Sequence, residues 1–184
     1  NKELLKKIDQ PLFEDYWERL NQSLEFLSQK KQRTCIRLTL VKGENMCELA
    51  NYANLIHKGD PDFIEVKGYM FVGSSRQRLT KKNMPFHEDI VAFSRALLKH
   101  LPDYDIVSEH IPSRVILLAK KKYYFNNQWH TWIDFEKFHN LALSGEEVMD
   151  YSKPTPQTGL SGKGTLTGIK VDEWTDELEF WEED

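Results

Sequence analysis

The chain has 184 residues, 40% of them hydrophobic and 12% aromatic, which is enough for one domain with a substantial core. No apolar run approaches the roughly 20 residues that a membrane span requires, so we expect no membrane association. The net charge of −4 hides two regions of opposite sign, because residues 172–184 carry eight acids and no base, a charge of −8, which leaves residues 1–171 at +4. A mildly basic body admits a polyanionic partner such as RNA.

Cysteine and histidine usage indicates the compartment and argues against a metal site. Cys35 and Cys47 form neither a CxxC pair nor a disulfide framework, a usage typical of a reducing compartment. We therefore predict a cytoplasmic protein. The histidines show no metal-binding spacing, so we predict no metal ligands in this chain. The first residue is not Met, and we expect the chain to be a piece of a longer protein.

Helices and strands alternate along most of the chain. Apolar residues recur every three or four positions, which predicts helices over 12–30, 46–57 and 86–101. Side-chain alternation predicts strands over 34–41, 63–72, 104–109 and 114–119. Residues 122–133 indicate a hairpin that turns at Asn126-Asn127, followed by a short helix over 135–143 capped by Asp134. From residue 152 onward the chain is rich in Gly, Pro, Ser and Thr and then acidic, which predicts a flexible tail.

The segment from Phe63 to Pro85 is the most informative part of the sequence. One face of its strand is aliphatic, whereas Glu65, Lys67 and Tyr69 lie together on the other face. The strand leads into a loop that carries two serines and four basic residues, Ser74, Ser75, Arg76, Arg78, Lys81 and Lys82. A charged pair on a strand that delivers a basic loop indicates a binding site.

The strand over 34–41 repeats this design, with Arg37 and Thr39 on its polar face. Alternating helices and strands imply an α/β fold with parallel strands joined by crossover helices. An open sheet between two helical layers would make both faces apolar. A barrel-like sheet with outer helices and an inner ligand would leave the inner face polar, and we favour this arrangement. These strands are too few to close a barrel, so the chain is predicted to be part of a larger one.

The sequence resembles the radical S-adenosylmethionine enzymes that make 4-demethylwyosine in tRNA. The most specific block is PDFIEVKGYMFVGSSRQRLTKKNMPFHEDIVAF at 61–93. Further matching blocks lie at 6–20, 33–45, 101–121 and 129–138, with a weaker one at 150–162. The resemblance covers roughly residues 2–160 and corresponds to the C-terminal portion of the family.

The resemblance implies a partial TIM-like barrel that holds a [4Fe–4S] cluster and S-adenosylmethionine. Family members condense N1-methylguanosine, 3′ of the anticodon of tRNA-Phe, with pyruvate. The product is the tricyclic base 4-demethylwyosine, made in wybutosine biosynthesis, and a family lysine is thought to hold pyruvate as a Schiff base. The electron donor is implied to be flavodoxin-like.

The chain departs from the family pattern in what it lacks. The three-cysteine cluster motif and the pyruvate lysine belong to an N-terminal barrel half that the sequence does not include, and neither Cys35 nor Cys47 matches a cluster ligand. We therefore expect this chain alone to be inactive and name no catalytic residue in it. The expected organisation is residues 1–121 as the C-terminal half of the barrel with the wyosine-forming region, 122–151 as a hairpin and helix extension, and 152–184 as the flexible tail.

Two groups of candidate site residues follow from these patterns. Arg37, Thr39, Glu65 and Lys67 are predicted to bind the cofactor, because a guanidinium and an ammonium suit a carboxylate or a phosphate. The alternative is a structural ion pair with Glu65. The predicted tRNA or substrate contacts are Tyr69, Ser74, Ser75, Arg76, Arg78, Asn83 and His87, because the C-terminal ends of barrel strands form the active face and such groups suit phosphate. The alternative for these residues is a solvated surface loop.

Two aromatic sets have two interpretations each. Trp129, Trp132 and Phe135 either stack on an unpaired base or pack as a hairpin on the sheet. Trp174 and Trp181 belong to the acidic tail, which either masks the basic site or is disordered. At the level of the whole chain, a fragment of a tRNA-modifying lyase competes with a non-catalytic RNA-binding or interaction module derived from the same family.

Overall fold

A computed structural model of the chain describes residues 1–145 and 150–155. The helices are α1 (Lys2–Asp9), α2 (Tyr16–Ser28), α3 (Leu49–Gly59), α4 (His87–Leu98) and α5 (Phe135–Ser144). The strands are β1 (Cys35–Leu40), β2 (Phe63–Gly68), β3 (Tyr104–His110), β4 (Val115–Lys120), β5 (Tyr124–Phe125), β6 (Gln128–Trp129), β7 (Trp132–Ile133) and β8 (Ser152–Lys153). Short 3₁₀ turns lie at Gly73–Gln77, Lys81–Asn83, Ile111–Ser113 and Lys121–Tyr123. No helix among these residues is long and apolar enough to cross a membrane.

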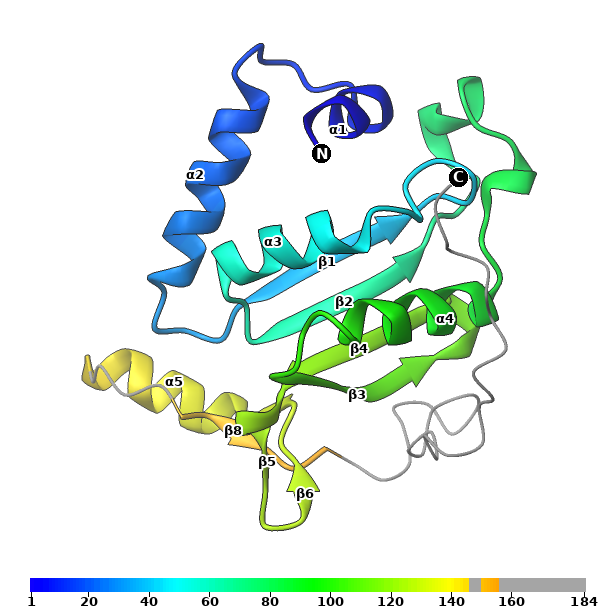
Figure 1. The fold of residues 1–184 in the computed structure, drawn as a ribbon. Helices are drawn as coiled ribbons and strands as arrows, with labels where there is room; N and C mark the ends of the chain where they lie inside the picture. Colours follow the sequence, from blue (N-terminus) through cyan, green and yellow to red (C-terminus); the bar gives the residue numbers. More distant parts are fainter. Residues whose placement is uncertain (146–149, 156–184) are drawn as a thin grey trace.

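The centre of the molecule is a four-stranded mixed sheet with the order β1-β2-β4-β3 (Figure 1). β1 and β2 are parallel, as predicted, and β4 pairs antiparallel with both β2 and β3. β3 therefore runs in the same direction as β1 and β2 but is not their neighbour, which corrects the expectation of an all-parallel barrel wall. The described strands form an open sheet with no closed barrel.

β4 takes the central place because its sequence is apolar on both sides. Its core reads VILLA; Ile116 and Leu118 are fully buried on one face, while Leu117 and Ala119 pack on the other. A continuous apolar run is typical of a strand that is covered on both faces. The tight 3₁₀ turn at 111–113 then returns the chain from β3 to β4 as an antiparallel pair.

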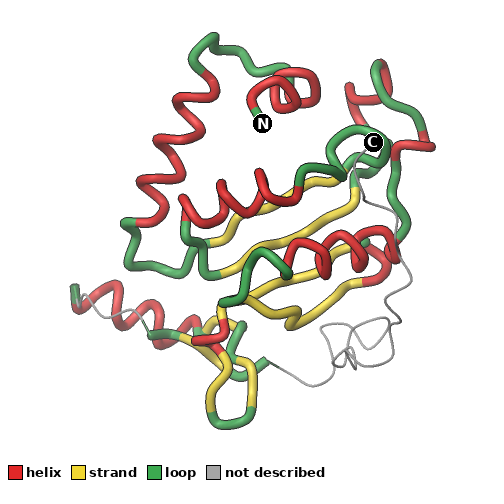
Figure 2. The backbone as a smooth tube through the Cα atoms, in the orientation of Figure 1, coloured by secondary structure: helices red, strands yellow, loops and turns green. Residues whose placement is uncertain are grey.

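Helices α3 and α4 cover one face of the sheet (Figures 1 and 2). The core between them and the strands contains the buried side chains of Ile56, Ile64, Phe93, Leu97 and Leu118. α2 packs beside α3. The prediction that the aliphatic faces of the first two strands meet helices is confirmed.

β2 is shorter than the predicted strand over 63–72. It ends at Gly68, where a Cβ would come within 3.1 Å of Pro85 Cγ and 3.2 Å of Arg114 Cβ, a tight approach that a side chain could make only if these neighbours shifted slightly. The Gly68 N–H donates to the Arg114 carbonyl, and the Tyr69 N–H donates to the Leu40 carbonyl. The chain then leaves the sheet and enters the basic loop.

The extension after the sheet follows the predicted hairpin and helix. Asn126 and Asn127 have φ of 53° and 57° in the turn between β5 and β6, which is the left-handed geometry that asparagine tolerates. Asp134 caps α5 by accepting from the Lys137 N–H at 3.0 Å. The predicted tail start at residue 152 is wrong, because Ser152 and Lys153 form β8 against β7 and Tyr151 is buried. The predicted acidic end with Trp174 and Trp181 lies outside the described residues.

Candidate cofactor and RNA site

The face of β1 and β2 that points away from the helices is polar. Because the two strands are parallel and in register, Arg37 lies beside Glu65, and Thr39 beside Lys67. Arg37 and Thr39 are exposed, and Glu65 and Lys67 are half-buried. The structure therefore brings all four predicted cofactor residues together on one face.

These four side chains differ in the interactions that they make with one another. Arg37 Nε donates to Glu65 Oε2 at 2.7 Å, the ion pair that the sequence left open as an alternative. Lys67 makes no hydrogen bond or ion pair with any described residue. An ammonium that has no partner among the described residues is available to an anionic ligand. Lys67 is therefore the strongest candidate on this face for contact with a carboxylate or phosphate.

The described residues do not fit an iron–sulfur cluster. They contain no group of three or more His, Cys, Asp or Glu side chains that could hold a metal ion. Partial burial of its sulfur and the nearby Glu65 carboxylate raise the pKa of Cys35 above the usual 9.0, so this side chain is a thiol at neutral pH. Metal ligation requires the thiolate.

The loop after β2 uses several of the predicted RNA-binding side chains to hold itself in place. Ser75 Oγ donates to the Val72 carbonyl at 2.6 Å, so its single proton is engaged and the Tyr69 hydroxyl donates to Ser75 Oγ at 2.8 Å. Tyr69 is only 8% exposed. Tyr69, predicted as a tRNA or substrate contact, is therefore largely covered and uses its hydroxyl to hold the loop. Ser74 is exposed and makes no side-chain hydrogen bond with the described residues.

Arg76 and Arg78 both bond backbone carbonyls with part of their guanidinium. Arg76 Nε donates to the Phe71 carbonyl at 3.2 Å, and its guanidinium lies over the Phe71 ring. Arg78 Nη1 donates to the Ile8 carbonyl at the end of α1, 70 residues away in sequence. Arg78 therefore joins the loop to α1, whereas the two Nη groups of Arg76 make no hydrogen bond within the described residues.

Asn83 and His87 have structural partners. Asn83 accepts from the Thr80 N–H and donates to the Lys42 carbonyl at 3.0 Å. The His87 side chain is 9% exposed, and its Nε2 lies 2.7 Å from a Glu109 carboxylate oxygen. The sequence placed His87 on the surface because it begins a helix, but its position on α4 faces β3. In this geometry it makes a buried contact instead of an exposed one.

The aromatic side chains of the extension also differ from one another. Trp129 packs against the cluster formed by Phe63, Ala119 and Tyr123, which is the hairpin-packing interpretation. Phe135, at the start of α5, is 67% exposed. The two side chains therefore do not form one stacking platform.

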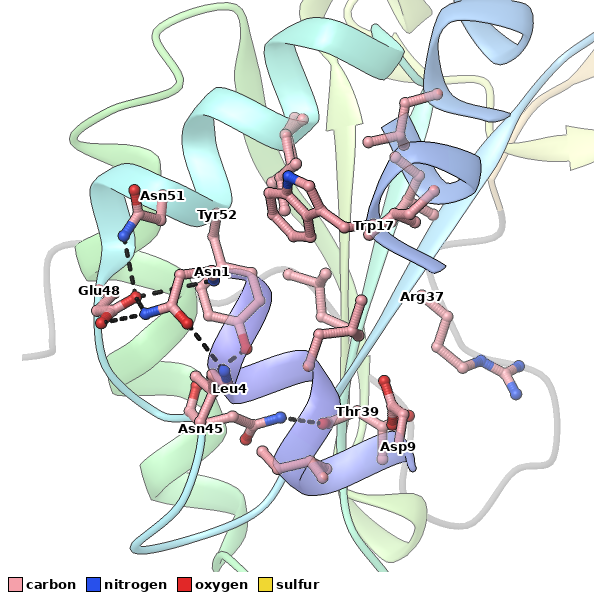
Figure 3. A pocket seen from close by; sticks show the side chains of 18 residues that line it. Asn1, Leu4, Asp9, Trp17, Arg37, Thr39, Asn45, Glu48, Asn51 and Tyr52 are labelled. Carbon is pink, nitrogen blue, oxygen red and sulfur yellow. Dashed lines mark hydrogen bonds and ion pairs between the residues drawn. The ribbon is translucent and has the colours of Figure 1, made fainter. Parts of the chain in front are cut away.

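A cavity of about 350 Å³ lies along the free edge of β1, between α1, α2 and α3 (Figure 3). Its lining is mainly apolar and includes Leu20, Ile36 and Leu38, and Trp17 lies in its wall. Asn1 and Asn51 bond the Glu48 carboxylate at one end. Arg37 belongs to the rim of this cavity but extends away from it (Figure 3).

The structure adds a group of residues that the sequence did not single out. Lys42 directly follows β1, and its Nζ lies 2.9 Å from Asp89 on α4 and over the Phe86 ring. Phe86 is 66% exposed. The signal in the sequence is the Phe86-x-x-Asp89 spacing, in which the acid accepts from the Phe86 N–H and caps the helix.

The fold and this site define a partial α/β sheet with a polar open face and a basic loop at the C-terminal ends of its parallel strands. The family described as wyosine base formation matches residues 58–120, the span from the end of α3 through β4. The matched span includes the whole Phe63–Pro85 segment.

Curated relatives extend the match over most of the chain. The chain is 47% identical to the S-adenosyl-L-methionine-dependent tRNA 4-demethylwyosine synthase of Danio rerio over 172 residues, 89% of this chain and 24% of that protein. It is 49% identical over 166 residues to the corresponding synthase of Arabidopsis thaliana, 88% of this chain and 26% of that protein. A solved structure described as TYW1 with a lysine-pyruvate adduct bound superimposes with a TM-score of 0.52 at 34% identity, covering 60% of this chain and 34% of that one.

The chain therefore resembles the C-terminal portion of the tRNA 4-demethylwyosine synthase family. It spans about a quarter of the length of the curated relatives cited above.

Proposed function

We propose that the chain forms the C-terminal part of an S-adenosylmethionine-dependent enzyme that makes 4-demethylwyosine from N1-methylguanosine of tRNA-Phe and pyruvate. The observation that carries this proposal is the wyosine base formation match over 58–120. That match covers β2, the basic loop, α4, β3 and β4, which form one hydrogen-bonded unit next to β1.

In this function the open face of β1 and β2 binds the cofactor. Lys67 and Arg37 suit the methionyl carboxylate of S-adenosylmethionine. Glu65 and Thr39 supply acceptors for its amine and its ribose hydroxyls. When bound, the cofactor and a [4Fe–4S] cluster supply the radical chemistry of a lyase, and the residues of this chain bind and orient the cofactor.

The cluster ligands and the pyruvate-binding lysine come, in this proposal, from a preceding barrel half. Among the described residues β1 pairs with β2 on one side only, so its other edge could accept a further strand. A related structure is described as having a lysine-pyruvate adduct bound. The proposed enzyme is cytoplasmic and takes electrons from a flavodoxin-like donor, and the 184-residue chain alone is inactive.

The tRNA contacts, in this proposal, come from the loop after β2. Arg76 offers its two Nη groups and Ser74 its hydroxyl, and both residues are exposed. Tyr69, Ser75, Arg78, Asn83 and His87 act indirectly, because each holds the loop or α4 in position through the contacts described above.

A non-catalytic RNA-binding module is the second candidate. It is favoured by the exposed Arg76 and Ser74 of the basic loop, which can contact phosphates without a cofactor. Both candidates keep the basic loop as an RNA contact, so product formation distinguishes them.

The test is a chimera in which this chain replaces the matching part of the Saccharomyces cerevisiae synthase, to which it is 46% identical over 171 residues. In yeast that lacks its own synthase, we expect the chimera to restore 4-demethylwyosine-derived nucleosides in tRNA-Phe, measured by mass spectrometry. Lys67→Met in the chimera should abolish the product while cluster content stays unchanged.

Lys137→Met is the matched control, because Lys137 is an exposed lysine on α5 whose Nζ lies 3.8 Å from Asp150. This variant should leave product formation intact. If the chimera accumulates, holds its cluster and binds tRNA but forms no product, the enzymatic function is refuted and the RNA-binding module stands.

A further inference from the structure

Phe86 is an exposed aromatic ring whose backbone is held firmly. Its N–H donates to Asp89 Oδ2 at 2.7 Å, and the same carboxylate binds Lys42 Nζ at 2.9 Å. The Lys42 ammonium lies 5.6 Å from the centre of the Phe86 ring. One acid on α4 therefore positions both the ring and the ammonium.

The backbones on either side of this group are also joined. The Lys42 N–H donates to the Asn83 carbonyl at 2.9 Å, and the Asn83 amide donates to the Lys42 carbonyl at 3.0 Å. These bonds lock the turn after β1 to the loop that precedes α4. Phe86, which is 66% exposed, is consequently fixed at the C-terminal ends of β1 and β2, where the open polar face begins.

Because the backbone at Phe86 is fixed, only the side-chain rotamer of the ring has to be ordered when it stacks on a ligand. Nucleobases that have left their helical stack are held on aromatic side chains in this way. Lys42 is neutralised by Asp89, so the ring itself contributes stacking with little net charge.

Two positive charges lie a few residues before Phe86 in the sequence. Lys81 and Lys82 are exposed in the 3₁₀ turn before Phe86, and neither makes an ion pair with any described residue. Two ammonium groups without described partners, on the turn that leads to an exposed ring, match an unstacked base together with the phosphates that flank it.

We propose that Phe86 is the stacking platform for one unstacked nucleobase of an RNA loop, with Lys81 and Lys82 on the adjacent phosphates. The inference rests on the proposed function, because a base in the anticodon region must leave its stack before an enzyme can modify it. It names a positioning residue for the RNA, distinct from the cofactor face.

The test uses the 184-residue chain and an RNA hairpin that carries 2-aminopurine in its single-stranded loop. Phe86→Leu should weaken binding roughly tenfold, because it removes one base–aromatic stack, and should leave the slope of log affinity against log salt unchanged. Phe86→Trp should preserve affinity and quench 2-aminopurine fluorescence further. Lys81→Gln with Lys82→Gln should instead reduce the salt slope by about 1.4, since each phosphate contact on a single strand contributes about 0.7.

Phe135→Leu is the matched control. Phe135 is 67% exposed and also lies at a helix start, but on α5 at the other end of β1 (Figure 1). Its replacement should change neither affinity nor fluorescence.

The outcomes separate this inference from the proposed function. If Phe86→Leu binds the hairpin as tightly as Phe135→Leu does, the stacking role of Phe86 is overturned while chimera activity still supports the enzyme. If Phe86→Leu lowers the melting temperature and leaves RNA affinity unchanged, the ring is structural and the inference is again overturned. If the wild-type chain shows no salt-dependent binding, both the inference and the RNA contacts of the proposed function fail.

Discussion

Arg33 offers the sharpest test of how the extension is held on the sheet. Its guanidinium lies over the rings of Phe63 and Tyr123 at 4.6 and 5.2 Å from their centres. Nη1 and Nη2 donate to the carbonyls of Trp132 and Thr131 at 2.8 and 2.5 Å. One side chain just before β1 thus holds β7 against the start of the sheet.

The expected cost of Arg33→Ala follows from these contacts. A hydrogen bond to a charged group contributes about 1.5–3 kcal/mol, and a cation over an aromatic ring about 0.5–2 kcal/mol. The site is half-buried and such terms are not additive, so we expect the docking of the extension to weaken by about 3 kcal/mol. Arg33→Lys keeps the charge but loses the planar fork, and should cost about half as much.

Hydrogen exchange measured by mass spectrometry is the appropriate assay, because the extension can open without global unfolding. The reporters are the amides of Asp134 and Thr155, which donate to the Tyr151 and Trp129 carbonyls at 2.9 and 2.7 Å. A loss of 3 kcal/mol should speed their exchange roughly a hundredfold.

The control for this experiment is Arg37→Ala. Arg37 is a 60% exposed arginine in a single ion pair, which should contribute little because solvent screens it. If both reporter amides keep wild-type protection in Arg33→Ala, or if Arg37→Ala exposes them equally, Arg33 does not hold the extension and the reasoning is wrong.

Two further predictions concern the acid sensitivity of the sheet and the basic loop. Burial disfavours the charged Asp62 carboxylate, but hydrogen bonds from Lys122 and the Thr34 N–H outweigh this effect and hold the pKa of Asp62 below its usual 3.8. A carboxyl group whose pKa is lower in the folded than in the unfolded state stabilises the fold above its unfolded pKa, and this stabilisation is lost as pH falls through its folded pKa. The difference in unfolding free energy between wild type and Asp62→Asn, measured by urea titration, should therefore be largest near neutral pH and should vanish below about pH 4. A difference that does not change with pH would contradict this prediction. Arg76→Ala should reduce the slope of log RNA affinity against log salt by about 0.7. Arg78→Ala should mainly speed hydrogen exchange of the α1 amides. Equal effects of the two substitutions on the salt slope would show that Arg78 also contacts RNA.

The sequence predicted the elements of the sheet better than their order. The polar faces of β1 and β2 were evident from period-two alternation, and the register of the parallel pair placed Arg37 beside Glu65 as that alternation required. The central position of β4 was not predicted, although its run of apolar residues from Val115 to Ala119 was visible. Alternating helices and strands favoured parallel neighbours, and the tight turn at 111–113 overrode that preference.

The sequence predicted the residue types of the candidate site more reliably than the exposure of those residues. Tyr69 and His87 have the chemistry of an RNA contact, but both are buried because β2 ends early and α4 turns its first residue toward Glu109. Phe86 was not chosen, because the helical spacing placed it on the apolar stripe of the predicted helix over 86–101, whereas it is exposed in the structure. Its significance comes from Lys42 and Asp89, which are distant in sequence from one another and meet only in the fold.

The division of roles within the basic loop has a physical consequence for ligand binding. Ser75 bonds a carbonyl at the start of the loop, while Arg78 and Asn83 bond carbonyls of α1 and of the turn after β1, so these side chains fix the loop internally and to its neighbours. Because those bonds fix the loop before any ligand arrives, binding does not have to include the cost of ordering it. Lys67 on the open face and Lys81 and Lys82 on the loop have no partner among the described residues and can then interact with an anion. A loop that is held in place by several of its own side chains is thus the arrangement expected of a preorganised phosphate-binding surface.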